Sequence, residues 1–249
     1  PVVMAGFAFS DVLSQVAADY PDTKFSIIDG WLEAPNVQVV GFAEDQGSYL
    51  VGMMAALASK TNTVGFIGGM DIPLIRRFGC GYAQGVKAVN ADATVILNMT
   101  GTTPSAWNDP TKGAELAKSQ KSQGADVIFA AAGGTGMGVL QAAADEGILS
   151  IGVDSNQNYM HPGSVLTSML KRVDVAVFNA FSAGADMPTG FIGMDLAAGG
   201  VGYAMDDNNA ALVSADMTAR VDAAADAIKS GSLKVHDYMS DETCPAASF

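Results

Sequence analysis

Residues 63–68 have the sequence Thr-Val-Gly-Phe-Ile-Gly, a short and almost wholly apolar run. Such a run is typical of a strand that is buried on both faces, because helices cover both sides of a parallel sheet. Similar runs recur before and after it, each followed by a helical stretch of about 10 to 15 residues. This alternation predicts an α/β protein with doubly wound parallel sheets.

The boundaries of the repeated units follow from turn residues and from helix-capping signals. Ser10 is the expected N-cap of the first helix. The stretch 47–59 carries small and apolar residues on every face, which indicates a buried helix. We expect strands at 2–5, 24–29, 37–42, 63–68, 94–99, 126–129, 150–153, 165–169 and 190–194, and helices at 11–18, 47–59, 75–89, 110–123, 137–145, 173–181 and 218–229.

Composition excludes several classes of function. The chain is 49% hydrophobic over 249 residues, enough for one large domain or two small lobes. Its formal net charge of -13, with only 13 Lys plus Arg, repels phosphate backbones and anionic lipid headgroups. Nucleic acid is therefore not an expected partner, and no apolar run is long enough to span a bilayer.

The cysteines and histidines are few and scattered. Cys80 and Cys244 do not form a disulfide framework, so we expect two independent thiols, with one long-range disulfide in an oxidising compartment as the alternative. His161 and His236 have no neighbours at the spacing of metal ligands. We predict no metal site and no cofactor.

Ligands of open parallel sheets bind beyond the carboxyl ends of the strands. The residues that follow the predicted strands are aromatic rings, carboxylates and glycines, with no nucleophile paired with a base. Rings offer stacking surface, carboxylates accept from hydroxyl groups, and glycines expose backbone N–H groups. This set suits a flat, uncharged, hydroxylated small molecule and predicts no catalytic residue. The ligand-binding candidates are Phe7, Phe9, Asp71, Trp107, Gly133, Gly134, Asp154 and Lys171.

Most of these residues also have a purely structural interpretation. Asp154 grips a vicinal diol or else caps a helix or an Asx-turn. Lys171 reaches the ligand, pairs with Asp154, or is a solvated lysine at a helix start. Trp107 stacks on a ring or packs locally. Phe7 and Phe9 alternate, so we expect one to face a cleft and the other to enter the core.

Gly133 and Gly134 open the glycine-rich run 133–138 between a predicted strand and a predicted helix. The spacing fails the G-x-G-x-x-G pattern of dinucleotide sites, which argues against a nucleotide cofactor. Two interpretations stay open: close packing of helix on strand, and a ligand contact at a helix N-terminus.

These motifs together resemble the basic membrane protein family of bacterial lipoproteins, whose characterised members include purine nucleoside receptors. Each stretch is weak alone, but their joint occurrence in the right order from residue 1 to about residue 202 is specific. The matching stretches are 6–10 (GFAFS), 20–25 (YPDTKF), 47–50 (GSYL), 64–73 (VGFIGGMDIP), 124–129 (GADVIF), 131–136 (AAGGTG), 151–155 (IGVDS) and 166–171 (LTSMLK).

The resemblance implies a type I periplasmic-binding-protein fold, with two lobes joined by three crossovers and a ligand between them. It also implies delivery of that ligand to an ABC permease and ATPase pair, without catalysis by this subunit. Carried over to this sequence, Trp107 and either Phe7 or Phe9 would sandwich the base. Asp154 and Lys171 would hold the ribose.

The sequence departs from the family at its start. Residues 1–6 have the pattern of a strand interior, and two further strand–helix units of the family have no counterpart. We therefore expect an incomplete N-terminal lobe over 1–60, a C-terminal lobe over 61–165, and over 166–249 a crossover back to the first lobe, a late strand and a closing helix.

From these observations we expect a solute-binding protein that is periplasmic or at the cell surface, with an N-terminal lipid anchor as its only link to the membrane. Its predicted partners are a purine nucleoside and the ABC permease and ATPase subunits. One alternative keeps the fold but binds a free nucleobase, a sugar or another small metabolite. An alternative of another class is a nucleoside-processing enzyme.

Overall fold

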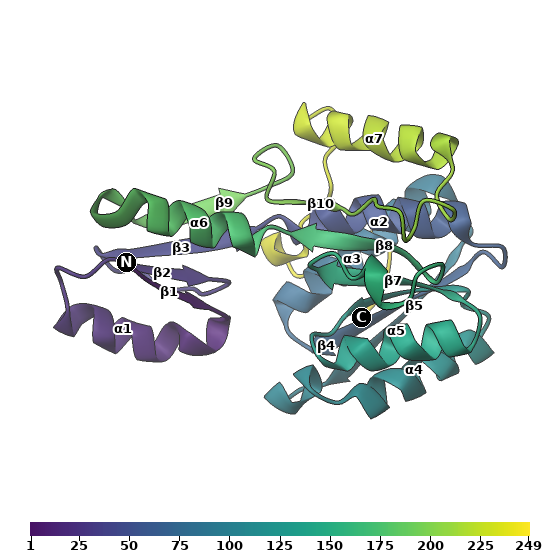
Figure 1. Cartoon of the computed structure of the whole chain (residues 1–249), viewed down its shortest axis with the longest axis horizontal. Helices are drawn as coiled ribbons and strands as arrows, with labels where there is room; N and C mark the ends of the chain where they lie inside the picture. The colour runs from purple at the N-terminus through teal and green to yellow at the C-terminus, as the bar shows by residue number, and fades with distance from the viewer. The chain divides into compact units, whose positions relative to one another are not determined.

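The computed structural model describes all residues, 1–249, and divides the chain into two compact units. Unit 1 comprises Pro1–Ala43 and Arg172–Val201, and unit 2 comprises Glu44–Lys171 and Gly202–Phe249. In each unit helices alternate with parallel strands (Figure 1). The predicted α/β class is confirmed.

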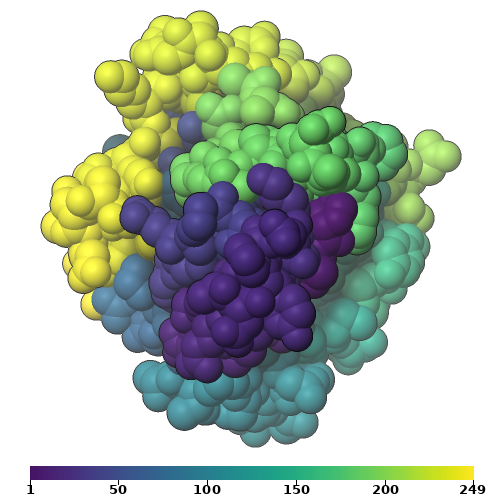
Figure 2. Space-filling view, turned by 90° about the vertical axis from the view of Figure 1, so that its left-hand side faces the viewer, coloured from purple at the N-terminus to yellow at the C-terminus, as the bar shows by residue number.

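Unit 1 contains a four-stranded parallel sheet in the order β1-β2-β3-β9. Its helices α1 and α6 lie on opposite faces of the sheet (Figure 1). Figure 2 shows the purple N-terminal residues and the green residues of α6 side by side on one surface of this unit. The elements are β1 Val2–Ala5, η1 Phe7–Phe9, α1 Ser10–Asp19, β2 Phe25–Ile28, β3 Val37–Phe42, α6 Val173–Ala183, η4 Gly184–Asp186 and β9 Gly190–Met194.

The core of unit 1 lies between α1 and one face of this sheet. Leu13 and Ala17 of α1 pack against Ile27 and Val39 of the strands. The side-chain amide of Asn36 donates to the carbonyls of three residues at the end of α1 and in the following turn, Ala17, Tyr20 and Thr23. A buried amide with these acceptors fixes the end of the helix against the start of β3.

Unit 2 contains a six-stranded sheet in the order β10-β8-β7-β6-β4-β5. Figure 1 shows α4 and α5 on one face of this sheet and α2 and α3 on the other. The elements are α2 Glu44–Ala58, β4 Thr63–Met70, α3 Pro73–Val89, β5 Thr94–Gly101, η2 Pro104–Trp107, α4 Pro110–Ser122, β6 Val127–Ala131, α5 Thr135–Asp145, β7 Leu149–Asp154, η3 Asn158–Met160, β8 Val165–Lys171, β10 Val201–Tyr203, α7 Ala215–Lys229 and η5 Tyr238–Ser240.

Glycines bring the backbones of α2 and α3 into direct contact. A Cβ atom on Gly52 of α2 would overlap the carbonyl of Tyr82, and one on Gly85 of α3 would overlap the carbonyl of Tyr49. A Cβ atom on Gly81 would meet the backbone of Asp45. This close approach places the first turn of α2 beside the first half of α3, which matters for the site below.

Most predicted elements are present, and β1, β3 and β9 have the predicted bounds. The Ser10 N-cap is wrong: α1 begins at Ser10 itself, and the Ser10 hydroxyl instead accepts from the backbone N–H of Trp31. Helix α2 starts at Glu44, three residues before the predicted start at Gly47, and its first two residues, Glu44 and Asp45, are buried in ion pairs. Strand β10 was not predicted, since three residues give too short a pattern.

The structure divides the chain differently from the lobes expected at 1–60, 61–165 and 166–249. Helix α2 belongs to unit 2, because the glycine contacts tie it to α3. The closing helix α7 also belongs to unit 2, and the chain crosses between the units after Ala43, Lys171 and Val201.

The two cysteines form a disulfide, Cys80–Cys244, which spans 164 residues of sequence. The expectation of two independent thiols is therefore wrong. The pairing could not be predicted from the sequence, because it depends on the C-terminal segment returning to lie on α3. None of the helices combines the length and hydropathy needed to cross a membrane.

Candidate ligand site

The carboxyl edge of the sheet in unit 2 collects most of the predicted ligand residues. Asp71 directly follows β4, Asp154 ends β7 and Lys171 ends β8. Gly133 and Gly134 lie between β6 and α5. Because these strands are parallel, their carboxyl ends share one edge, where ligands of such sheets bind.

Trp107 is half-buried, and its ring rests on glycine backbone. A Cβ atom on Gly69 of β4 would overlap this ring, and one on Gly133 would lie 3.5 Å from its Cε3 atom. The Thr135 hydroxyl donates to the carbonyl of Ala106 at 2.7 Å, which fixes η2 to the start of α5. Trp107 and the glycine loop therefore form one local surface, as both the packing and the stacking interpretations require.

Gly133 has φ +54°, a backbone conformation that residues with a Cβ atom rarely adopt. Gly134 is the N-cap of α5. Both glycines are exposed. A Cβ atom on Gly134 would lie 3.1 Å from the carbonyl oxygen of Trp107. The absence of side chains thus serves close packing of η2 on α5 and leaves backbone exposed at a helix start.

Asp154 also has a left-handed backbone, with φ 65°, and it is exposed at the end of its strand. In the β7–β8 register it lies opposite Leu170, the neighbour of Lys171. It does not cap the following helix η3, whose N-cap is Gln157. A non-glycine residue with positive φ costs about 1–3 kcal/mol, and such strain clusters at functional sites.

Asp71 is held by the neighbouring helix. Arg76 Nε donates to Asp71 Oδ1 at 2.6 Å and its NH2 to Oδ2 at 2.9 Å, so the guanidinium grips both oxygens. These hydrogen bonds hold the pKa of the Asp71 carboxyl below its usual range. Asp71 is therefore an ionised member of a bidentate pair at the strand end.

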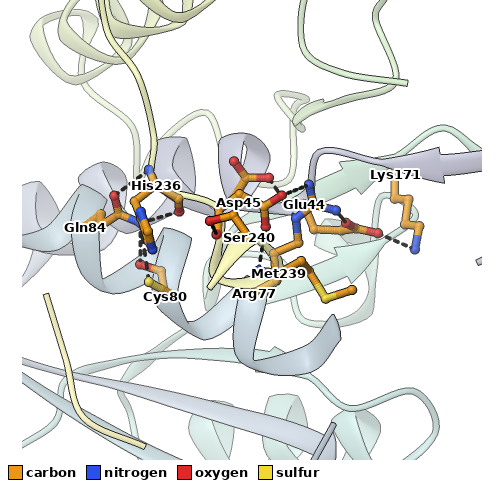
Figure 3. A network of polar contacts seen from close by, with 10 residues as sticks. Glu44, Asp45, Arg77, Cys80, Gln84, Lys171, His236, Met239 and Ser240 are labelled. Carbon is orange, nitrogen blue, oxygen red and sulfur yellow. Dashed lines mark hydrogen bonds and ion pairs between the residues drawn. The ribbon is translucent and has the colours of Figure 1, made fainter. Parts of the chain in front are cut away.

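Lys171 is buried rather than solvated, so the interpretation of a solvated helix-start lysine is wrong. Its Nζ lies 2.8 Å from Glu44 Oε1 (Figure 3). It also lies 5.8 Å from the centre of the Phe78 ring. The exposed fraction of the side chain is 5% for Lys171 and 0% for Glu44. A cation this deep requires such a partner, because burying an unpaired charge is costly.

Arg77 joins this pair to further carboxylates. Its NH1 lies 3.0 Å from Glu44 Oε2 and its Nε 3.0 Å from Asp45 Oδ1 (Figure 3). Its NH2 lies 2.8 Å from Asp237 Oδ2. Each nitrogen of the planar guanidinium thus has its own carboxylate. Burial raises the pKa of Asp45 to about 6, although the Arg77 charge opposes this shift.

Glu44, Asp45 and Arg77 were not predicted as site residues. A signal was present: Glu44 and Asp45 follow the end of β3 by two and three residues, and Arg77 interrupts a helix rich in apolar and small residues. No group of three or more His, Cys, Asp and Glu side chains is arranged to hold a metal ion.

Unit 1 carries the remaining predicted residues at the carboxyl ends of its own strands. Phe7 stacks on Trp31, with ring centroids 5.7 Å apart and planes 7° from parallel. Phe9 is 49% exposed and Phe7 is half-buried, so the expectation that one of them enters the core is wrong. The 3₁₀ turn η1 replaces the expected alternation, and none of its three residues is buried.

The arrangement of the strands and of the groups at their ends is that of the type I periplasmic-binding-protein fold. This fold defines a class of proteins that includes the solute-binding components of ABC transporters. A solved ABC transporter solute-binding protein from Aeropyrum pernix K1 is similar to this chain, with 27% identity and a TM-score of 0.82. The similarity covers 93% of this chain and 76% of that one.

A family model described as "ABC transporter substrate-binding protein PnrA-like" matches residues 2–236, and the chain belongs to this family. The ABC transporter nucleoside-binding protein BmpA of Lactococcus lactis subsp. cremoris is 33% identical over 87% of this chain and 67% of its own length. The CD4+ T-cell-stimulating antigen of Listeria monocytogenes serovar 1/2a is 35% identical over 92% of this chain and 68% of its own length. The predicted resemblance to basic membrane proteins is confirmed.

Proposed function

We propose that this substrate-binding protein captures a purine nucleoside and delivers it to an ABC permease. The observation that carries the proposal is the carboxyl edge of unit 2, where the Trp107 ring lies on bare glycine backbone on the same sheet edge as Asp154 and Lys171. A relative in the same family is named a nucleoside-binding protein.

The chemistry of these groups matches the two halves of a nucleoside. An indole face stacks on a planar base and contributes without requiring a charge on the ligand. The two oxygens of the Asp154 carboxylate match the two O–H donors of a vicinal diol, and the Lys171 ammonium donates to a hydroxyl oxygen. In this proposal Asp71, Gly133 and Gly134 line the same edge of unit 2.

The proposed setting is outside the cytoplasmic membrane, in the periplasm or at the cell surface, with a lipid anchor and with permease and ATPase subunits as partners. The Cys80–Cys244 disulfide supports this setting, because disulfides persist in oxidising compartments. Family membership supports a binding role rather than catalysis, since the relatives are substrate-binding proteins by name.

Thermal unfolding with added ligands tests the proposal. Inosine, guanosine or adenosine should raise the melting temperature, because a ligand that binds only the folded chain stabilises it. Adenine and ribose should each give a smaller shift, since each lacks half of the contacts. A shift with a sugar and none with any purine nucleoside would contradict the proposal. Release of hypoxanthine from inosine would instead indicate a nucleoside-processing enzyme.

A further inference from the structure

The C-terminal segment His236–Phe249, here called the strap, is fastened along α3. Gln84 and His236 exchange two hydrogen bonds: the Gln84 amide donates to the His236 carbonyl at 2.9 Å, and the His236 N–H donates back at 2.8 Å. The disulfide joins Cys244 to Cys80 of the same helix. Except for His236, the strap lies beyond residues 2–236, which the family model matches.

The strap reaches the buried ion pairs through Asp237. Asp237 Oδ2 accepts from Arg77 NH2 at 2.8 Å, and its other oxygen accepts from the backbone N–H of Met239, so the carboxylate is held within its own turn. Asp237 is the only strap residue among the three carboxylates around Arg77. It therefore fixes one corner of the guanidinium from outside the helix pair α2–α3.

Glu44 transmits this constraint to Lys171. One of its oxygens pairs with Arg77 and the other with Lys171, so Glu44 bridges the two cations. Glu44 and Lys171 are almost fully buried, where ion pairs are little screened. A change in the orientation of Arg77 must therefore be accommodated by the carboxylate that holds Lys171.

A second contact line runs from the strap to Asp71. The Tyr238 hydroxyl accepts from Arg76 NH1 at 3.1 Å, and the Arg76 guanidinium lies over the Phe249 ring at 5.7 Å. Arg76 in turn grips both oxygens of Asp71. The strap thus contacts both arginines that hold carboxylates near the carboxyl edge of the sheet.

We propose that the strap is a positioning element for the ligand site, which orients Lys171 through Asp237, Arg77 and Glu44, and Asp71 through Tyr238 and Arg76. The disulfide keeps the strap in place without itself contacting the site. The effect on ligand affinity rests on the proposed function, whereas the effect on Lys171 does not.

The test compares Asp237→Asn with Asp241→Asn in the chain of residues 1–249. Asp241 belongs to the same strap but contacts His236 and Thr243 rather than an arginine, so it is a matched control. Two quantities are measured: the side-chain ¹⁵N and ¹H resonances of Lys171 without ligand, and the binding kinetics of inosine. Measurements are made well below the melting temperature of each variant.

Asp237→Asn should shift the Lys171 resonance and weaken inosine binding about fivefold through faster dissociation, with little change in the association rate. Asp237→Glu should restore most of the affinity, and Asp241→Asn should change neither quantity. An unmoved Lys171 resonance in Asp237→Asn, or equal shifts in both Asn variants, would overturn the proposal. A further outcome is that the wild-type chain binds no nucleoside while Asp237→Asn still shifts the Lys171 resonance. In that case the proposed function fails and the positioning role stands.

Discussion

Glu44 Oε1 lies 2.8 Å from Lys171 Nζ, although the first turn of α2 and the end of β8 are far apart in the sequence. The close packing of α2 on α3 brings Arg77 to the second oxygen of the same carboxylate. A strand-end lysine is thereby held as a charged group inside the protein. Such an arrangement holds a donor at a fixed position for a polar ligand, at a cost in desolvation.

Glu44→Gln should lower the free energy of unfolding by about 3 kcal/mol, because an amide leaves the buried Lys171 ammonium without a charged partner at that position. Urea denaturation at neutral pH measures the change. The control is Glu115→Gln on α4, where the carboxylate is exposed. A loss as small as that of a surface pair, below about 1 kcal/mol, would show that the Glu44–Lys171 pair is not energetically buried.

Asp45 should give the stability a specific pH dependence. Its pKa is about 6 in the folded chain against 3.8 in the unfolded chain, so between these values the folded state holds the proton more tightly. Its contribution to stability is therefore greatest at low pH and falls by about 3 kcal/mol as the pH rises from about 4 to about 6.

The comparison of wild type with Asp45→Asn isolates this contribution, since the other carboxylates titrate in both proteins. The difference in unfolding free energy, wild type minus variant, should decrease over this pH range. A difference that stays constant, or that increases with pH, would mean that Arg77 outweighs burial and holds the Asp45 pKa at or below its ordinary value.

Reduction of Cys80–Cys244 should lower the stability of the chain by about 4 kcal/mol, because the disulfide closes a loop of 164 residues and restricts the unfolded state. For a chain of this size the melting temperature should fall by roughly 8–16 °C. The Cys80→Ser/Cys244→Ser double variant should melt at the temperature of the reduced wild type and be insensitive to reductant. Equal melting temperatures with and without reductant would contradict a constraining role.

Local pattern accounts for the parts of the fold that were predicted well. Strand β3 was predicted with its observed bounds because Val37–Phe42 is nearly apolar and follows the turn residues Pro35 and Asn36. The positions of Asp71 and Asp154 at the carboxyl edge could also be predicted. Each residue lies at the carboxyl end of its strand whatever the order of the parallel strands in the sheet.

Residue partnerships could not be predicted in the same way. The burial of Glu44 depends on Arg77, 33 residues away, and on Lys171, so its sequence neighbours carry no sign of it. The pairing of Cys80 with Cys244 likewise depends on the path of the chain after α7. These long-range contacts determine which charged residues at the strand ends are buried. Local sequence periodicity does not predict such contacts.

Gly69→Ala should weaken nucleoside binding without any change to Trp107 itself. The new Cβ atom would overlap the Trp107 ring and force it from its place on β4. If that ring stacks on the base, the affinity of Gly69→Ala for inosine should fall about fivefold, which corresponds to the lower end of the range of about 1–3 kcal/mol for the loss of one stacked base. Trp107→Ala, which removes the ring, should lose at least as much affinity. Isothermal titration with inosine measures both variants.

The matched control is Gly202→Ala, where a Cβ atom meets nothing within 4 Å. In a Trp31→Phe background Trp107 is the only tryptophan, so its fluorescence reports directly on stacking by the ligand. Inosine should change this fluorescence in the parent and in Gly202→Ala, and less so in Gly69→Ala. Unchanged affinity in Trp107→Ala would leave the ring with a packing role alone, because a stacked base cannot lose its platform without cost.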